Sequence, residues 1–341
     1  MAHNDKMMQL FSFMDGNEGY LNDLIDRIKS NVVVPFIGAG MSAPIYPTWA
    51  KFISDTLGNK RISHAKKDKI KRLLGEYKYE KAASTICESL GKADYAERIK
   101  SAFREEKIYE SELTNMAVSL VPLIFKTGTV ITTNFDRLLH KVYAQYGCPF
   151  TDYLTPYEVS DDAKGDFHQG IAHYLLKLHG DYLHTDRIVF TKEQYDKCYG
   201  KNYDSEYVSF ITDALSSKVL LFLGCSLDTD RTMSLMQKTA LDKSRTHYAV
   251  VECGCDDSDH LDAAFYEKNK RLSDMGIRCI WYPKGRYEFV YSILEGINAR
   301  LPQSAPLTAP SEREPRRGPI REQSSPPPDS PPIPPFDRCE P

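Results

Sequence analysis

The sequence lacks long apolar runs and has little net charge. No run approaches the ~18–20 consecutive apolar residues that a transmembrane helix needs, and the formal net charge is −3 over 341 residues. The first sixteen residues include Asp5 and Asp15 and hold no sustained apolar core, which is unlike a secretory signal. A chain without a broad positive field is not suited to nucleic acid by default. We therefore expect a cytoplasmic protein with no membrane segment and no direct nucleic-acid binding.

The sequence also lacks a dense cysteine framework. Its eight cysteines are scattered, which is typical of a protein from a reducing compartment. Cys253 and Cys255 are the only close pair, and they are separated by one residue instead of the two or more found between structural zinc ligands. We expect no metal site.

Proline is concentrated at one end of the chain. Thirteen of the twenty prolines lie in residues 302–341, mixed with Ser, Arg and Glu. Such a segment has too little apolar surface to offset the cost of ordering, and its prolines remove backbone donors. We expect a folded domain over residues 1–301 and a disordered Pro-rich C-terminal tail over 302–341. A proline-rich ligand for a partner is the alternative to a merely solvated tail.

Within residues 1–301, short apolar runs alternate with helical patterns. This alternation predicts an α/β fold, a Rossmann-like doubly wound parallel sheet with helices on both faces. Residues 58–119 show helical spacing only, which predicts a helical insertion and a ligand cleft between it and the carboxyl ends of the strands. The expected strands are Val32–Ile37, Val130–Thr132, Tyr174–Leu178, Val219–Leu223, Tyr248–Val251 and Ile277–Trp281.

Two of these expected strands end in a glycine turn followed by a serine. The first turn spans Gly38–Ser42 and the second spans Gly224–Leu227. Glycine lets backbone amides approach a pyrophosphate closely, and the serine adds a hydroxyl donor. An ordinary structural turn is the alternative for each. Pro44 stands near the place where a dehydrogenase fingerprint needs its third glycine, so an ordinary dehydrogenase is disfavoured.

Two other expected strands end in polar side chains. Asn134 lies in the segment Thr132–Asp136, where it is able to orient a water or a ribose hydroxyl, although helix capping alone also explains Thr, Asn and Asp at this position. His179 lies in the segment Leu176–Asp181, at the end of a buried strand. An imidazole there is a candidate general base near neutral pH, whereas a lone histidine is more often structural or solvated.

Taken in order, these four segments resemble the motifs of the Sir2 superfamily. Those motifs are Gly-Ala-Gly-x-Ser, a Thr-x-Asn-x-Asp strand end, a histidine–glycine pair and Gly-x-Ser. The resemblance is closer to the Sir2-like (SIR2_2-type) branch found in bacterial anti-phage effectors, in which Pro-x-Trp follows the glycine loop, here Pro47–Trp49. The sequence departs from deacylase sirtuins, because the loop Ala43–Pro47 lacks their Gly-x-Pro-Asp-Phe-Arg run and no Cys-x-x-Cys pair is present.

The resemblance implies that NAD+ lies across the strand ends and is the substrate. It implies that Asn134 and Asp136 face the nicotinamide ribose and that His179 accepts a proton from a ribose hydroxyl or from water, so these three residues are the expected catalytic groups. The residues expected to bind NAD+ are Gly38, Ala39, Gly40, Ser42, Thr133, Gly224, Ser226 and Leu227.

The same resemblance implies a reaction. Sirtuins build their peptide groove beside a zinc module, so its absence favours water as the nucleophile and NAD+ hydrolysis to nicotinamide and ADP-ribose. An enzyme that depletes NAD+ in anti-phage defence must be held inactive until it is triggered, so we expect an activating protein from the same operon, a homo-oligomeric switch, or both. A protein deacylase or ADP-ribosyltransferase is one alternative, and a non-catalytic NAD or ADP-ribose sensor is another.

Overall fold

The computed structural model describes residues 2–43, 45–157, 159, 165, 173–215, 217–228, 231–239, 241 and 245–302. The chain divides into two units, Met1–Leu301 and Pro302–Pro341. Apart from Pro302, the tail predicted to be disordered lies outside the described residues.

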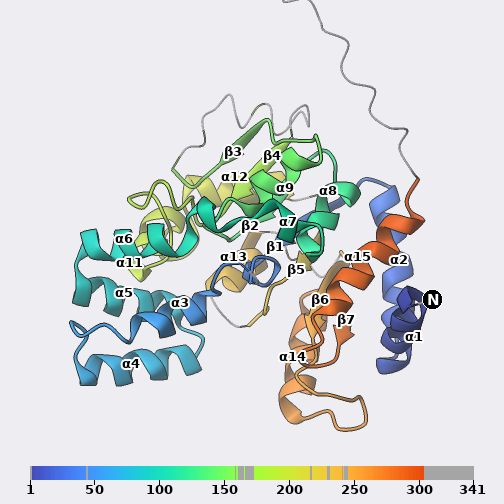
Figure 1. Cartoon of the computed structure of the whole chain (residues 1–341), viewed down its shortest axis with the longest axis horizontal. Helices are drawn as coiled ribbons and strands as arrows, with labels where there is room; N and C mark the ends of the chain where they lie inside the picture. The colour runs from blue at the N-terminus through green and yellow to red at the C-terminus, as the bar shows by residue number, and fades with distance from the viewer. Residues whose placement is uncertain are drawn as a thin grey trace, which may run out of the picture. The chain divides into compact units, whose positions relative to one another are not determined.

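The described strands of the first unit form one parallel sheet with the order β3-β4-β2-β1-β5-β6-β7 (Figure 1). The chain runs from β1 toward β3 and then returns to the other side of β1, so its winding direction switches between β1 and β5. Ligands of doubly wound sheets bind at such a switch point. The strands are β1 Val33–Ile37, β2 Val130–Thr132, β3 Asp152–Leu154, β4 Tyr174–Lys177, β5 Val219–Leu223, β6 His247–Glu252 and β7 Ile277–Tyr282.

Helices cover both faces of the sheet, and none that the structure describes is both long and apolar enough to cross a membrane. The helices are α1 Ala2–Phe13, α2 Asn17–Lys29, α3 Trp49–Thr56, α4 His64–Gly75, α5 Tyr79–Leu90, α6 Lys92–Phe103, α7 Glu110–Leu113, α8 Val121–Ile124, α9 Leu138–Gln145, α11 Lys192–Tyr199, α12 Glu206–Leu215, α13 Arg231–Thr239, α14 Ala263–Asp274 and α15 Glu288–Arg300. Three 3₁₀ turns, η1 Ala39–Met41, η2 Glu105–Lys107 and η3 Ala117–Leu120, complete the described elements.

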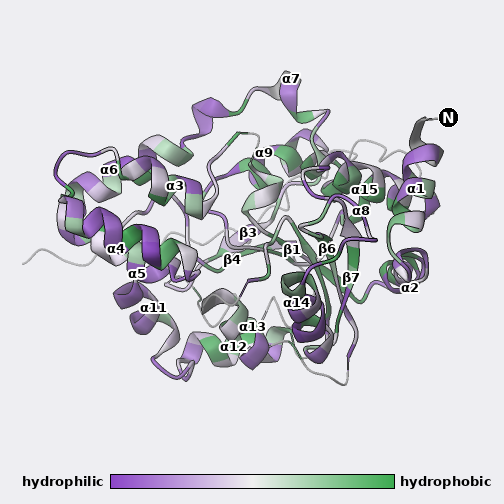
Figure 2. Ribbon diagram, turned by 90° about the horizontal axis from the view of Figure 1, so that it is seen from below, coloured by the Kyte–Doolittle hydropathy of each residue, from purple (hydrophilic) through white to green (hydrophobic). Residues whose placement is uncertain are grey.

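The strand β5 shows how the sheet divides the core. Because successive side chains of a strand point to opposite faces, Leu221 and Leu223 pack with α2, α9 and α15, whereas Leu220 and Phe222 pack with α11 to α14. All five β5 residues are buried, as expected of a strand covered on both faces. The strands accordingly appear as hydrophobic ribbons between more polar helices (Figure 2). The predicted doubly wound α/β fold is confirmed.

The six predicted strands are all present, each within one residue of its expected bounds. The short edge strand β3 was not predicted. It has three residues, of which Asp152 is exposed and Leu154 is buried, and this is too short a run for a period of two to be recognised.

Helices alone connect β1 to β2 among the described residues, and they begin at Trp49, before the predicted start at residue 58. Local signals explain their ends. The hydroxyl groups of Thr48 and Ser63 cap α3 and α4 by accepting from backbone amides of the first turn. Gly91 ends α5 with a φ of 84°, which glycine adopts at little cost.

The edge strand β7 is covered by the N-terminal helices through a buried asparagine. Asn17 donates from Nδ2 to the carbonyls of Leu10 and Trp281 at 2.8 and 2.9 Å, and its Oδ1 accepts from the Trp281 amide at 2.9 Å. One side chain thus satisfies backbone groups of an edge strand that would otherwise be free to pair with another chain.

The glycine turns after β1 and β5 pack directly on each other. The amides of Gly38 and Gly40 donate to the carbonyls of Leu223 and Gly224, both at 2.8 Å. A Cβ on Gly40 would lie 2.9 Å from the Gly224 Cα, and a Cβ on Gly224 would lie 2.4 Å from the Met41 nitrogen. The glycines therefore allow two backbones to touch at the switch point.

We predict that Gly224→Ala destabilises the domain by about 2–4 kcal/mol, because a Cβ clashes with the β1 turn and a φ of 66° strains alanine. Urea unfolding measures the change. Gly75→Ala is the control, since nothing lies within 4 Å of its added Cβ, and it should stabilise α4 by up to about 1 kcal/mol. Equal effects of the two substitutions would contradict the packing argument.

Candidate active site

The four polar segments meet at one edge of the sheet. They follow β1, β2, β4 and β5, which are consecutive neighbours in the order β4-β2-β1-β5. Because parallel strands end at the same edge, segments that are far apart in sequence become adjacent there. Some side chains of these segments are in direct contact, whereas others are not.

Asn134 lies at the centre of this edge and is only 4% exposed. Its Nδ2 donates to the Gly38 carbonyl at 3.2 Å and to the Ser42 hydroxyl at 3.1 Å. A carbonyl only accepts hydrogen bonds, so this contact fixes the orientation of the amide. The Oδ1 atom then points elsewhere and is buried without a hydrogen-bond partner. A buried acceptor left unpaired is costly and is suited to a ligand or water donor.

Asp136 lies beside Asn134 and shares Ser42 with it. The Ser42 hydroxyl donates to the Asp136 carboxylate, and Oδ1 of Asp136 also accepts from the Leu138 amide at 3.0 Å. Asp136 therefore accepts from the first amide of α9 from the position before the N-cap Arg137, and its carboxylate also lines the cavity. Burial raises the pKa of Asp136, and the charge of Lys177 opposes that shift.

These side chains line a small cavity between the ends of the strands and the helices that connect β1 to β2, which we call the helical segment. Its volume is about 10 Å3, which is room for about one water molecule, whereas sites for drug-sized ligands measure about 300–1,000 Å3. The cavity is therefore closed to a dinucleotide in this structure. Its lining residues are Ala39, Ser42, Pro47, Trp49, Phe103, Asn134, Phe135 and Asp136.

His179 lies behind this cavity and is fully buried. Its Nδ1 donates to the Thr133 carbonyl at 3.2 Å, so its Nε2 accepts from the Tyr195 hydroxyl at 2.9 Å. The Trp49 ring covers the imidazole with 4.6 Å between ring centroids. Burial lowers the pKa of His179 to about 3, and the Thr133 contact only partly opposes this. The imidazole is neutral, and it contacts the Asn134 segment through the Thr133 carbonyl and through the Phe135 ring, whose centroid lies 6.4 Å from its own.

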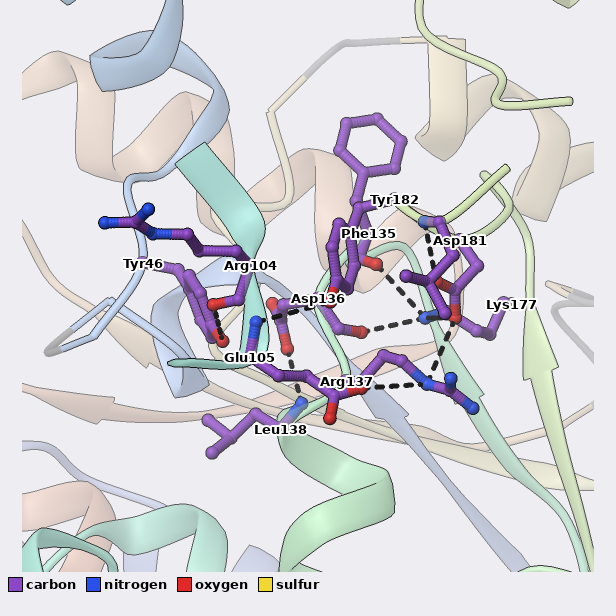
Figure 3. Close-up of polar contacts among 11 residues, drawn as sticks. Tyr46, Arg104, Glu105, Phe135, Asp136, Arg137, Leu138, Lys177, Asp181 and Tyr182 are labelled. Atoms are coloured by element: carbon purple, nitrogen blue, oxygen red, sulfur yellow. Dashed lines mark hydrogen bonds and ion pairs between the residues drawn. The ribbon is translucent and has the colours of Figure 1, made fainter. Parts of the chain in front are cut away.

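The Lys177 side chain holds the loop from Phe135 to Asp136 in place (Figure 3). The Nζ atom of this fully buried residue donates to the carbonyls of Phe135 and Asp136 at 3.2 and 2.8 Å and pairs with Asp181 at 2.8 Å. Burial acts to raise the pKa of Asp181, but the charge and hydrogen bond of Lys177 outweigh it and lower the pKa.

Ion pairs and a hydrogen bond connect the helical segment to the same loop. Arg137 lies between Glu105 and Asp181, with ion-pair distances of 3.4 and 3.7 Å, and the Tyr182 hydroxyl accepts from the Glu105 amide at 3.3 Å (Figure 3). The helices and the strand ends are therefore linked directly beside the cavity.

The first predicted NAD-binding turn uses most of its amides internally. Gly38 and Gly40 donate across to the β5 turn, and Ser42 donates to Ala39. Of the second turn, Ser226 is exposed, and Leu227 is buried with a φ of 55°. The structure therefore brings Ser42, Asn134 and Asp136 into contact and leaves Ser226 apart from them.

A larger, open hollow of about 370 Å3 lies between α13 and α14. Arg271 connects it to the site edge by donating from Nη2 to the Leu227 carbonyl at 2.7 Å. None of its lining residues was predicted for the site. They are Gln237, Glu267, Lys270, Arg271, Asp274 and Met275. Across the described part of the chain, no group of three or more His, Cys, Asp or Glu side chains is arranged to hold a metal, and the expectation of no metal site stays a prediction.

Comparison with known proteins agrees with this arrangement. Residues 128–280, which include the segments after β2, β4 and β5, match the family described as SIR2-like domain. This part of the chain is similar to a SIR2-like domain. The predicted Sir2 resemblance is confirmed.

Two curated proteins to which this chain is similar are named NAD(+) hydrolase ThsA. The protein from Bacillus cereus (strain MSX-D12) is 25% identical over 253 residues, covering 73% of this chain and 49% of the relative. The protein from Acinetobacter baumannii (strain 532279) is 24% identical over 241 residues, covering 67% and 44%. The chain thus spans about half the length of the curated relatives it matches.

Sequence reasoning missed two kinds of residue in the candidate site. Lys177 and Asp181 were visible as charges inside and just after an apolar strand, which is a usable signal because such charges are almost never buried unless paired. Tyr195 and Phe103 gave no signal, because each lies on a helix whose apolar pattern is explained by packing.

We predict that Lys177→Met destabilises the domain by about 3 kcal/mol, because it leaves two buried carbonyls without their donor and leaves the buried Asp181 carboxylate with Arg137, at 3.7 Å, as its remaining cation. Chemical unfolding monitored by circular dichroism measures the loss. Lys51→Met is the control, since it breaks an exposed pair with Asp55 and should cost less than about 1 kcal/mol. A loss as small as that of the control would show that Lys177 is not needed for folding.

We predict that protonation of His179 destabilises the fold in acid. Its folded pKa of about 3 lies below the ordinary histidine pKa of 6.5, so the unfolded state binds more protons between these values and stability falls as pH drops from 6.5. The slope is at most about 1.4 kcal/mol per pH unit. Unfolding of wild type and His179→Gln at pH 7.5, 6.0 and 5.0 tests this, and identical pH profiles would refute it.

Proposed function

We propose that this chain hydrolyses NAD+ at the bond between nicotinamide and ribose. The observation that carries the proposal is the buried, unpartnered Oδ1 of Asn134 beside the hydroxyl of Ser42 and the carboxylate of Asp136. The SIR2-like match and the names of the two relatives support NAD+ as the molecule that acts there.

In the proposed reaction, water attacks C1′ of the nicotinamide ribose. The C–N bond breaks, neutral nicotinamide leaves with the bonding electron pair, and ADP-ribose and one proton are the other products. Asn134 accepts a hydrogen bond from the water or from a ribose hydroxyl. In this reaction the Asp136 carboxylate would face the ribose carbon on which positive charge develops, and a fixed charge in a dry site stabilises such a transition state more than it does in water.

His179 has two possible tasks in this proposal. With its pKa near 3 and its Nε2 bound to Tyr195, the imidazole is a weak base in the closed arrangement. It accepts the proton only if substrate entry moves Trp49 and hydrates the ring. Otherwise it acts through the Thr133 carbonyl as a positioning residue for the Asn134 segment.

The closed cavity supports a triggered enzyme. A volume of about 10 Å3 does not admit NAD+, so we propose that an activating protein, a second copy of the chain, or both open the site by displacing residues such as Trp49. Depletion of NAD+ during defence against phage is the proposed biological role.

Nicotinamide release by the purified full chain tests the activity, alone and with proteins encoded beside it. We expect release by wild type under an activated condition. Asn134→Ala should lower kcat by about 10²–10³-fold, the cost of removing one polar group that stabilises a transition state, and His179→Ala should also lower it. Asn269→Ala, an exposed change on α14, is the matched control and should have no effect.

Other outcomes identify the alternatives. Loss of acetyl groups from a peptide with nicotinamide release would indicate a deacylase, and transfer of labelled ADP-ribose to protein would indicate a transferase. Binding of NAD+ without turnover, unchanged in Asn134→Ala, would indicate a sensor. Absence of nicotinamide release under every condition, from protein that melts normally, would refute hydrolysis.

A further inference from the structure

A dense cluster of positive charge occupies one short stretch of the helical segment. Residues 60–72 hold seven Lys and Arg side chains and one carboxylate, Asp68, so this stretch has a net charge of +6 in a chain whose net charge is −3. The rest of the chain therefore has a net charge of −9. Most of the stretch lies on α4, whose ribbon is strongly hydrophilic (Figure 2).

Most of these charges have no acidic partner among the described residues. Arg61 pairs with Asp94, and Arg72 lies 4.0 Å from Glu76. Five lysines make no ion pair within the described part of the chain. Three of them are exposed to solvent and two are half-buried. They are Lys60, Lys69 and Lys71, which are exposed, and Lys66 and Lys67.

The arrangement does not serve the helix itself. The first turn of α4 contains no acidic residue and instead holds Lys66 and Lys67, although the positive end of the helix dipole favours Asp or Glu there. Lys67 and Lys71 are four residues apart and Lys69 and Arg72 are three apart, so like charges are neighbours on the helix surface and destabilise it slightly. Folding alone does not account for this pattern.

An aromatic side chain adjoins the same charges. Tyr77 follows the end of α4 between Arg72 and Lys78, and it is 44% exposed. Its φ is 56°, a left-handed conformation that usually belongs to glycine or asparagine at this position after a helix. Its ring packs edge-on against Tyr79, with 6.4 Å between centroids, so it is held in place while remaining accessible.

The apolar face of α4 is not available to a membrane. Ile70 and Leu73 are buried in the core of the domain, and α4 packs on α5. A helix that lies in a bilayer interface needs an exposed apolar face opposite its charges. The charges with one exposed ring fit a flexible polyanion that presents phosphates and flat bases.

We propose that the α4 basic surface binds single-stranded nucleic acid. This surface consists of Lys60, Lys66, Lys67, Lys69, Lys71, Arg72 and Tyr77. The lysines contact backbone phosphates, and an unpaired base stacks on Tyr77, the combination used by proteins that bind single strands without sequence preference. The binding is independent of the proposed reaction.

The negative charge of the whole chain does not prevent this binding. Interactions between exposed charges are largely screened beyond ~10 Å at 0.1 M salt, so the local cluster decides what contacts α4. The expectation of no nucleic-acid binding rested on the charge averaged over all residues, and that average hides a segment of opposite sign.

Fluorescence anisotropy of the full chain with labelled 20-nucleotide DNA and RNA single strands, between 50 and 300 mM salt, tests the proposal. We expect binding to the DNA strand, the RNA strand or both, and we expect it to weaken as salt increases. Comparison of the two affinities also shows whether deoxyribose or ribose is preferred. The triple variant Lys67→Gln/Lys69→Gln/Lys71→Gln should reduce the slope of log affinity against log salt by about 2, because each contact to a single strand contributes about 0.7.

Two further variants separate binding from folding. Tyr77→Gly removes the ring and suits the left-handed backbone, so we expect affinity to fall about five- to tenfold while the melting temperature stays equal or rises. Lys29→Gln/Lys201→Gln/Lys284→Gln makes the same change in net charge at exposed positions elsewhere, and its affinity should stay within about twofold of wild type.

The proposal is overturned by absence of binding at 50 mM salt, by equal weakening in the two lysine triples, or by unchanged affinity of Tyr77→Gly. Tighter binding to a 20-base-pair duplex than to either single strand also overturns it. So does binding to vesicles of anionic phospholipid with none to the oligonucleotides.

Discussion

The ammonium group of Lys177 is the buried charge around which the polar end of the sheet is arranged. It bonds to two carbonyls of the loop after β2 and to the carboxylate of Asp181 after β4. A buried ion pair adds little net stability compared with apolar side chains of similar size, but its geometry is restrictive. We infer that Lys177 fixes the shape of the loop and thereby the direction in which the Asn134 and Asp136 side chains point.

The turns after β1 and β5 impose the second constraint. Their glycines let the two backbones bond to each other, and the amides of Gly38 and Gly40 are used in that contact. The polar groups that face the cavity are then side chains, chiefly Ser42 and Asn134. Phosphate contacts to a bound dinucleotide must come from other groups or from a movement of these turns.

The basicity of His179 depends on the position of the side chains that bury it. An aromatic cover of Trp49 and the hydroxyl of Tyr195 keep the imidazole dry and neutral. The same Trp49 lines the cavity that is too small for NAD+. A movement of Trp49 would therefore both enlarge the cavity and expose the imidazole to water.

The sequence by itself determined the fold class, six of the seven strands that the structure describes and the edge of the sheet where polar segments gather, because each of these follows from local periodicity and from the ends of strands. It did not reveal β3, which is too short for a period to be recognised. It also did not reveal that Lys177 supports the Asn134 loop, that Trp49 covers His179, or that glycine amides bond across the switch point. Only the tertiary structure decided these features, because they are contacts between residues far apart in the chain, and their burial sets hydrogen-bond partners and pKa values that no local pattern encodes.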